Sequence, residues 1–375
     1  MKKLNLSKKA CFKLLGVAGF LALTVPNLAR ACSAFRLMVD DKVVVGKSYD
    51  WLLGHGHGAV FTNLRGISKT ALNLNDSPNP AHWVSKYGSV TLTQFGKGFP
   101  ISGINEKGLV VEMLQLKETR YNSEQDELPF VNEAQWSQFQ LDNFASVDEV
   151  LANVDKLRVV QAFTGIHYFI TDTSGKSTVI DFVRHKPVVH VGVTLPVPGI
   201  TNDTYLHSIM LRNGALWANR WILSEVRTSG MRFLTVADRI EESKSVPKEQ
   251  LVDYAFQTLE KVQQNGISTS TPLVHSQWNI VYDLREGVIR FRTHKADQIK
   301  VLRMDGLDFS PAAVSKTFDM NTSNIEGDIT TKLADFTPEF NRQLIDKNWL
   351  LLGKKLRTQV IRYGLSEAGC ELPLD

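Results

Sequence analysis

Residues 32–51 read CSAFRLMVDDKVVVGKSYDW, and the rest of the chain is interpreted around this stretch. Apolar and other residues alternate loosely from 33 to 39, Asp40 and Asp41 open a turn, and three valines follow at 43–45. β-Branched residues that follow an acidic turn predict a β-hairpin. The second strand would return the chain so that Lys47 and Asp50 pass near Cys32.

The residues before the hairpin have the composition of an export signal. Residues 1–13 carry five lysines, an apolar run occupies 14–25, and Ala29 and Ala31 stand three residues and one residue before a cleavage point. This pattern is typical of a secretory signal peptide, and it predicts a periplasmic or secreted protein. Cleavage after Ala31 would make Cys32 the first residue of the mature chain. A cysteine with a free α-amino group joins a nucleophile to a base.

The charge of the chain changes once this signal is removed. Six of the 43 Lys and Arg residues, and none of the 39 acids, lie in residues 1–31, which leaves 37 basic against 39 acidic residues. The net charge of +4 therefore belongs to the signal and gives no argument for nucleic-acid binding. No later stretch approaches the ~20 apolar residues of a membrane span.

Cysteine usage indicates a fold that is held by packing. Cys11 lies inside the signal, so Cys32 and Cys370 remain in the mature chain. A disulfide between these two is the ordinary alternative to a catalytic role for Cys32. We disfavour it because residues 365–375 have the composition of a polar tail, and a disulfide-stapled fold would carry several pairs.

Hairpin-rich and helical stretches alternate along the chain. This order predicts an α+β protein with mostly antiparallel sheets covered by helical layers, as in a four-layer α-β-β-α sandwich. We expect a signal peptide at 1–31, a main domain at 32–315 and a helical extension at 316–375. The expected elements after the first hairpin include a strand at 109–116, helices at 132–144 and 146–156, a meander at 167–191, helical stretches at 206–227, 231–242 and 247–264, a hairpin at 277–293, a strand at 299–304, and helices at 339–345 and 350–361.

Several motifs follow one another in an order and spacing that are specific together. They are Cys32, Arg36, Gly46 and Asp50-Trp51, then 83–90 (WVSKYGSV), 103–109 (GINEKGL), 141–149 (LDNFASVDE), Thr201-Asn202 and Arg232-Phe233. In these motifs the chain resembles the choloylglycine hydrolase and penicillin V acylase family of N-terminal-nucleophile amidases, and its exported Gram-negative branch most closely. The resemblance spans roughly residues 32–310 and implies the four-layer fold of that family.

The resemblance also implies a role for each matching residue. Cys32 would be the nucleophile, and Asp50 would orient its amine by accepting a hydrogen bond. Asn202 would hold the oxyanion or the substrate, and Arg232 would favour the thiolate. Each residue also has an ordinary structural interpretation: a buried thiol for Cys32, turn residues for Asp50 and Asn202, and a solvated helix arginine for Arg232.

Two positions depart from the pattern of bile-salt hydrolases. Lys47 stands where those enzymes have arginine, so the charge is kept and the planar fork is lost. Gln115 stands where they have asparagine, so its amide lies one methylene further out. Both are expected in the catalytic site, and both argue against bile-salt specificity more than against amide hydrolysis.

Large apolar side chains are candidates for the acyl pocket. Trp51, Trp83, Tyr87 and Met113 could bind an aromatic or fatty acyl group, although such residues more often form the core. His55 and His57 form too small a set for a metal site, so we expect neither metal nor cofactor.

The main hypothesis is an amidase that hydrolyses a small acyl amide, such as penicillin V, an N-acyl homoserine lactone or a conjugated bile salt. The alternative is an exported binding protein, lipid-anchored through Cys32, that keeps the fold without the activity. The family resemblance further implies a homotetramer.

Overall fold

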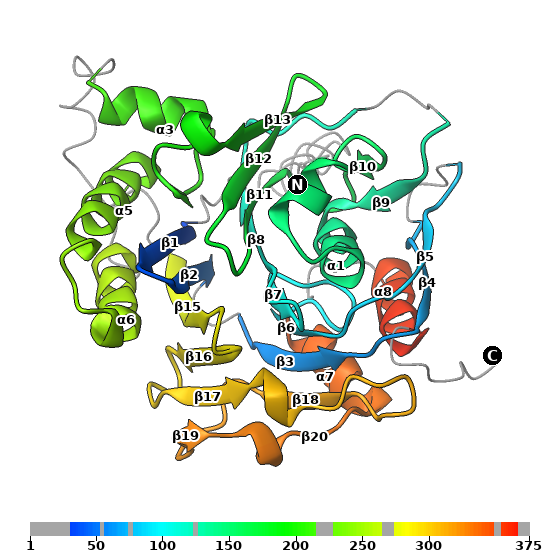
Figure 1. The fold of residues 1–375 in the computed structure, drawn as a ribbon. Helices are drawn as coiled ribbons and strands as arrows, with labels where there is room; N and C mark the ends of the chain where they lie inside the picture. The colour runs from blue at the N-terminus through cyan, green and yellow to red at the C-terminus, as the bar shows by residue number, and fades with distance from the viewer. Residues whose placement is uncertain are drawn as a thin grey trace, which may run out of the picture.

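The computed structural model describes residues 31–52, 56–73, 78–122, 127–214, 228–264, 274–348 and 354–366. Two large, mostly antiparallel sheets lie face to face, and helices cover their outer faces (Figure 1). This arrangement confirms the predicted α-β-β-α sandwich.

The predicted hairpin lies inside the seven-stranded sheet. β1 (Ser33–Val39) pairs with β2 (Lys42–Leu52), and Ser33 lies opposite Ser48. A Cβ on Gly46 would lie 2.5 Å from Cζ of Phe35, so only glycine lets that ring cross the hairpin. The other strands of this sheet are β14 (Gly199–Ile200), which pairs with β1, β15 (Val274–Asp283), which pairs with β2, and then β16 (Val288–Thr293), β17 (Lys300–Arg303) and β19 (Gly327–Asp328).

The nine-stranded sheet contains the predicted meander at one edge and the predicted buried strand near its centre. Its order is β13 (Lys186–Val191), β12 (Ser177–Val183), β11 (Ile166–Thr171), β8 (Val110–Gln115), β7 (Ser102–Asn105), β6 (Ser89–Thr93), β3 (Ala59–Asn63), β18 (Lys316–Asp319) and β20 (Ala334–Asp335). Two small sheets, β4 (Ser68–Thr70) with β5 (His82–Val84) and β9 (Phe130–Asn132) with β10 (Arg158–Val160), complete the strands.

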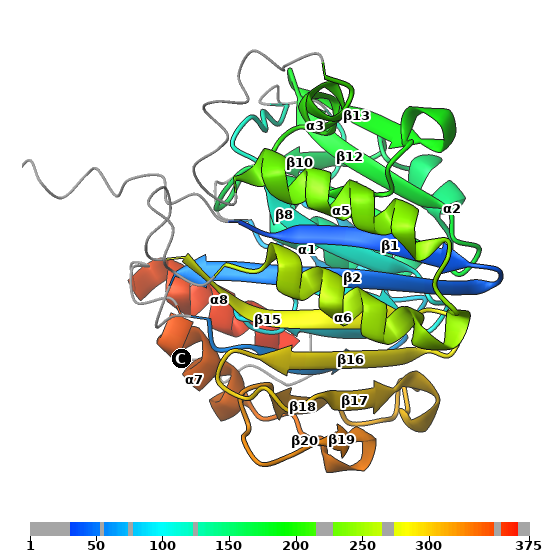
Figure 2. The same cartoon turned by 90° about the vertical axis from the view of Figure 1, so that its left-hand side faces the viewer.

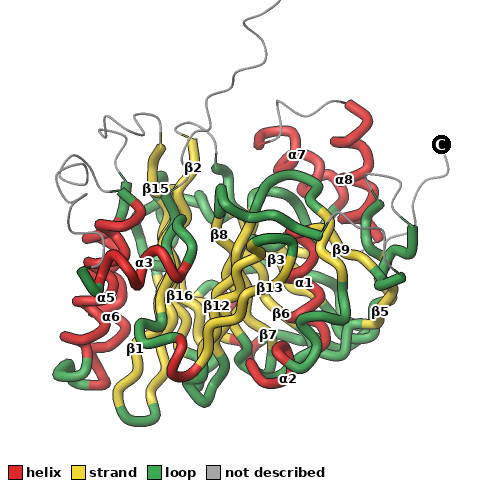
Figure 3. Tube along the Cα trace, turned by 90° about the horizontal axis from the view of Figure 1, so that it is seen from above, coloured by secondary structure: helices red, strands yellow, loops and turns green. Residues whose placement is uncertain are grey.

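Helices form the two outer layers. α5 (Ser229–Ser243) and α6 (Leu251–Val262) cover the seven-stranded sheet, as Figure 2 shows. α1 (Glu133–Asn143) packs on β7 and β8, so the strands lie between it and the α5–α6 layer (Figure 3). The shorter helices are α2 (Val147–Leu151) and α3 (Tyr205–Arg212). α3 ends before the predicted limit at 227, and residues 215–227 lie outside the described part of the chain.

The apolar residues of the first hairpin belong to two different hydrophobic clusters. Val43 and Val45 of β2 face the space between the sheets, together with Ala34 of β1. Val44 and Phe35 face the opposite side and pack under α5 and α6. Successive side chains of a strand point to opposite faces, so one hairpin serves both layers.

The C-terminal segment joins the sandwich. β18 pairs with β3, and β19 pairs with β17, so residues after 315 supply strands to both large sheets. α7 (Pro338–Asn348) and α8 (Lys354–Ser366) follow, close to the two predicted C-terminal helices. A helical extension alone therefore does not describe this segment. None of the helices in the described ranges has the length and apolar character of a membrane span.

Candidate active site

The candidate nucleophile lies at the open end of the hairpin. Cys32 directly precedes β1, is 3% exposed, and has its Sγ 3.9 Å from the backbone oxygen of Asp50. Burial raises the pKa of the Cys32 thiol; the positive charges of Lys47 and Arg232 lower it, and the charge of Asp50 raises it. The nitrogen of Cys32 is joined to Ala31 in the chain as written.

The two oxygens of the Asp50 carboxyl differ in their hydrogen bonding. Its Oδ1 accepts hydrogen bonds from Ser48 Oγ at 2.8 Å and from Ser276 Oγ at 2.5 Å. Its Oδ2 is buried and has no hydrogen-bond partner among the described residues. Burial raises the pKa of Asp50, whereas Arg232 and the two serine bonds lower it. An acceptor is therefore available beside Cys32 for one further donor.

Arg232 connects the nucleophile to the asparagine. This buried residue of α5 donates through Nη1 to the backbone oxygen of Cys32 and, at 2.8 Å, to Ser33 Oγ. Its Nη2 donates to Asn202 Oδ1 at 3.0 Å. Burial lowers the pKa of Arg232, while the charges of Asp50 and Cys32 raise it. The solvated-helix interpretation of this arginine is therefore wrong.

Asn202 and Gln115 meet through a backbone atom. Asn202 Nδ2 donates to the carbonyl oxygen of Gln115 at 2.8 Å, and its own N–H donates to Ser229 Oγ at 2.9 Å. The side chain of Gln115 instead donates to Thr164 Oγ1 at 2.9 Å. The structure thus brings Gln115 to the site as an acceptor for Asn202.

Lys47 is a fully buried cation beside the thiol. Its Nζ donates to the carbonyl oxygen of Met113 at 2.9 Å. The positive charge of Lys47 therefore lowers the pKa of Cys32 from the inner face of β2. The charges of Asp50 and Arg232 affect the same pKa from the α5 side. Met113 contributes this carbonyl, and its 7% exposed side chain belongs to the main hydrophobic core.

The predicted acyl-pocket residues are dispersed. Trp51 is half-buried at the end of β2, stacked on Tyr49 and edge-on to Phe95. Trp83 packs on Phe139 of α1 and donates to Asp142 at 2.7 Å. The structure therefore places Trp51 near the site and Trp83 in the α1 layer.

Tyr87 and the predicted histidine loop lie elsewhere. Tyr87 contacts Lys86 and Lys107 near the turn before β8. β8 carries Gln115 at its other end, so Tyr87 is separated from the site by a strand length of about 20 Å. The backbone of His57 is bonded to Asn348 of α7, and His55 lies outside the described residues. The described residues contain no cluster of three or more potential metal ligands.

The sequence interpretation missed the hydroxyl groups that hold the charged residues. Ser48 stands two residues before Asp50 on the same strand face, which is a signal that could have identified it. Ser276 and Ser229 come from distant segments and have no local signal. Ser33, next to the nucleophile, is likewise an acceptor for Arg232.

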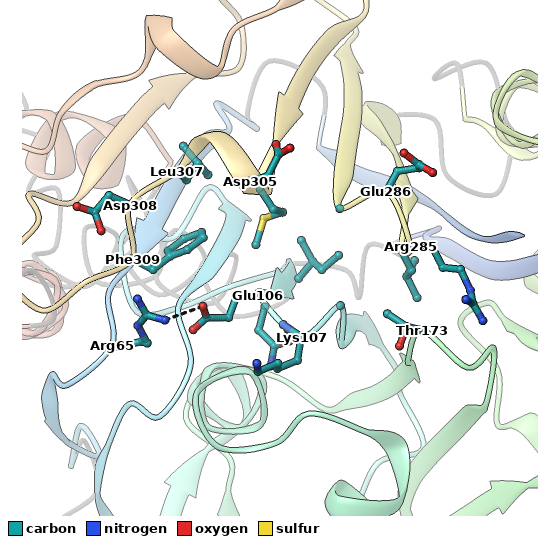
Figure 4. Close-up of a pocket in the computed structure, with 16 residues that line it drawn as sticks. Arg65, Glu106, Lys107, Thr173, Arg285, Glu286, Asp305, Leu307, Asp308 and Phe309 are labelled. Carbon is teal, nitrogen blue, oxygen red and sulfur yellow. Dashed lines mark hydrogen bonds and ion pairs between the residues drawn. The ribbon is translucent and has the colours of Figure 1, made fainter. Parts of the chain in front are cut away.

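A polar cavity lies at the opposite end of the sheets. It measures about 490 Å³ and is formed by the turns at 104–108, 284–287 and 304–309 (Figure 4). Arg65 and Glu106 form an ion pair of 2.9 Å at its wall. This cavity is separated from Cys32 by the length of β8, so it is no part of the candidate site.

Solved structures share this architecture. The penicillin V acylase of Agrobacterium tumefaciens superposes with a TM-score of 0.70 at 24% identity, over 82% of this chain and 98% of that one. A mutant of the conjugated bile acid hydrolase of Clostridium perfringens superposes with a TM-score of 0.64 at 19% identity, over 79% and 99% of the two chains. The chain therefore shares the fold of these two enzymes.

Sequence comparison defines the family. Residues 32–215 match the family of linear amide C–N hydrolases, choloylglycine hydrolase family. A penicillin V acylase of Pectobacterium atrosepticum is 32% identical over 123 residues, which are 29% of this chain and 33% of that protein. The matched region thus spans about a third of that relative. The chain belongs to the choloylglycine hydrolase family, and the resemblance seen in its motifs is confirmed.

Proposed function

We propose that the mature chain hydrolyses linear acyl amides through an acyl-enzyme on Cys32. The observation that carries this proposal is the buried Oδ2 of Asp50, which has no hydrogen-bond partner among the described residues. It belongs to a residue whose backbone oxygen lies 3.9 Å from Cys32 Sγ. Cleavage after Ala31 would convert the Cys32 nitrogen into an amine that can donate to this oxygen.

The reaction then proceeds in two stages. The α-amine takes the thiol proton, and the thiolate attacks the amide carbon to give a tetrahedral oxyanion. Asn202 and backbone N–H groups stabilise this oxyanion. The C–N bond breaks, the amine leaves with the proton from the ammonium group, and water hydrolyses the thioester to release the acid.

The surrounding charges support the chemistry. Lys47 and Arg232 both favour the thiolate, and Asp50 favours the ammonium form that arises when the amine takes the proton. Replacing Lys47 with neutral methionine should therefore slow acylation more than it weakens substrate binding.

The substrate classes are proposed from the family resemblance together with the site. Penicillin V and N-acyl homoserine lactones are preferred over conjugated bile salts because Lys47 and Gln115 depart from the bile-salt hydrolase pattern. Trp51 and Phe95 offer an aromatic surface at the end of β2 for the acyl group.

The location is proposed from the leader. A signal peptide at 1–31 would export the chain to the periplasm or medium, and the cut would create the active terminus there. The uncleaved precursor should be inactive, because its Cys32 nitrogen is an amide. We also propose a homotetramer, which size-exclusion chromatography with light scattering would test.

The decisive experiment compares the mature protein with two variants on a panel of the three amide classes. Intact mass should show a chain that begins at Cys32, and amine release should be lost in Cys32→Ala and reduced in Cys32→Ser. Turnover by Cys32→Ala at the wild-type rate would refute the mechanism. A diacylglyceryl mass on Cys32 would instead support the lipid-anchored binding protein.

A further inference from the structure

A buried histidine–aspartate pair lies beneath the turn that carries Asn202. His167 of β11 is fully buried, and its Nε2 lies 2.7 Å from the carbonyl oxygen of Thr201. Its Nδ1 lies 2.8 Å from Oδ1 of Asp181 on the neighbouring strand β12. The other Asp181 oxygen accepts from the N–H of Tyr205, the first residue of α3, at 2.8 Å. The pair therefore connects the nine-stranded sheet to both ends of the Thr201–Tyr205 segment.

The partners of the His167 ring define its protons. A backbone carbonyl oxygen only accepts hydrogen bonds, so Nε2 must carry a hydrogen. Its Nδ1 and Asp181 Oδ1 hold one proton between them, because two lone pairs would otherwise face each other at 2.8 Å. This hydrogen bond orients the ring so that Nε2 donates to Thr201.

The turn held by this pair is the one that reaches the nucleophile. Thr201 is followed by Asn202, whose side chain bonds Gln115 and Arg232, and Arg232 bonds the carbonyl oxygen of Cys32. The Thr201 hydroxyl and the Asn202 N–H are fixed separately by Ser229 of α5. The carbonyl of Thr201 ties the backbone of this turn to β11, and His167 is its donor.

We propose that His167 and Asp181 are positioning residues that aim Asn202 at the reacting carbonyl. The proposal rests on the proposed amidase function. The pair acts through the Thr201 carbonyl and does not touch the thiol. It defines where the oxyanion donor stands, so its loss should lower kcat, while KM should change little.

The variants separate charge from geometry. His167→Phe removes the donor to Thr201 and should lower kcat about 10- to 100-fold with KM within about threefold. Asp181→Asn keeps both hydrogen bonds but removes the carboxylate. The Nδ2 of the new asparagine can donate to Nδ1 of His167, and its Oδ1 can accept from the N–H of Tyr205. This variant should keep kcat within about fivefold, whereas Asp181→Leu should resemble His167→Phe.

A neighbouring histidine is the matched control. His190 lies on β13 of the same sheet, and its ring packs against Tyr205 at 4.7 Å. His190→Phe removes an imidazole from the same sheet edge and leaves the Thr201 contact in place, so kcat should stay at the wild-type value. Far-ultraviolet circular dichroism and urea unfolding verify that each variant is folded.

A nitrogen-detected NMR measurement tests the pair independently of activity. Wild-type protein with labelled histidine should show a proton bonded to Nε2 of His167 at neutral pH, and Asp181→Asn should keep it. A wild-type ring without a proton on Nε2, or wild-type kcat in folded His167→Phe, would overturn the proposal. Absence of all amide hydrolysis by the wild type would refute the proposed function instead, and the NMR result would remain interpretable.

Discussion

Glu112 offers a stability test of the space between the two sheets. This residue of β8 is fully buried, and its Oε2 accepts from Ser102 Oγ at 2.5 Å. Burial raises the pKa of Glu112 to about 7, although the charge of Lys47 and the hydrogen bonds of Ser102 and Tyr282 lower it. Replacing Glu112 with glutamine should therefore change how stability depends on pH.

The direction follows from proton linkage. The folded chain binds the Glu112 proton more tightly than the unfolded chain, whose carboxyl keeps its ordinary value of 4.5. The stability from the protonated group is complete below pH 4.5 and is lost as the pH rises through 7. At about 1.4 kcal/mol per pKa unit, the loss amounts to roughly 3 kcal/mol. Glu112→Gln imitates the protonated carboxyl, so it should equal the wild type near pH 4.5 and exceed it by about 3 kcal/mol at pH 8.

Urea unfolding at pH 4.5, 6, 7 and 8, followed by tryptophan fluorescence, measures this difference. Glu241→Gln is the control, because Glu241 is an exposed partner of Lys244 and its replacement should change stability little at any pH. Parallel stability curves for the wild type and Glu112→Gln between pH 4.5 and 8 would refute the reasoning. So would a variant that is less stable than the wild type at pH 8.

Three further predictions concern hydrogen bonds and packing elsewhere in the fold. Asn348→Ala removes bonds of 3.0 and 2.9 Å to the backbone of His57, so we expect about 1–3 kcal/mol lower stability; an unchanged urea midpoint would contradict this. Trp83→Phe removes the 2.7 Å hydrogen bond to Asp142, so the free energy of unfolding in urea should fall by about 1–2 kcal/mol while kcat stays unchanged. A large loss of kcat would show that Trp83 does line the acyl pocket. Gly46→Ala should lower stability by about 1–3 kcal/mol in the same assay, because its Cβ meets the buried ring of its cross-strand neighbour; wild-type stability would show that the ring moves aside freely.

The sequence predicted the parts of the fold that depend on local patterns. The hairpin at 33–51 is specified by its valines and by Asp40, which adopts a left-handed φ of 52° at the turn. The pairing of β2 with β15 joins segments more than 200 residues apart, and no local pattern specifies it. β19 and β20 have two residues each, which is too short for a recognisable period.

The candidate site was predictable where a motif existed. Cys32, Asp50, Asn202 and Arg232 came from the family resemblance, and the structure brings all four together. The buried charged groups that support these four residues were not predicted, because their hydrogen-bond partners lie on strands and turns far away in sequence. His167 is an example: its contacts come from β12 and from the residue after β14.

The late strands have a consequence for the order in which the chain can fold. β3 pairs with β18, and β17 pairs with β19, so one edge of each large sheet is completed only by residues after 315. During synthesis or translocation these edges would expose unpaired N–H and C=O groups until the C-terminal segment emerges. The residues after 315, about a sixth of the chain, thus cover these two edges. Nascent chains that stop before them would present two open β-edges to other chains.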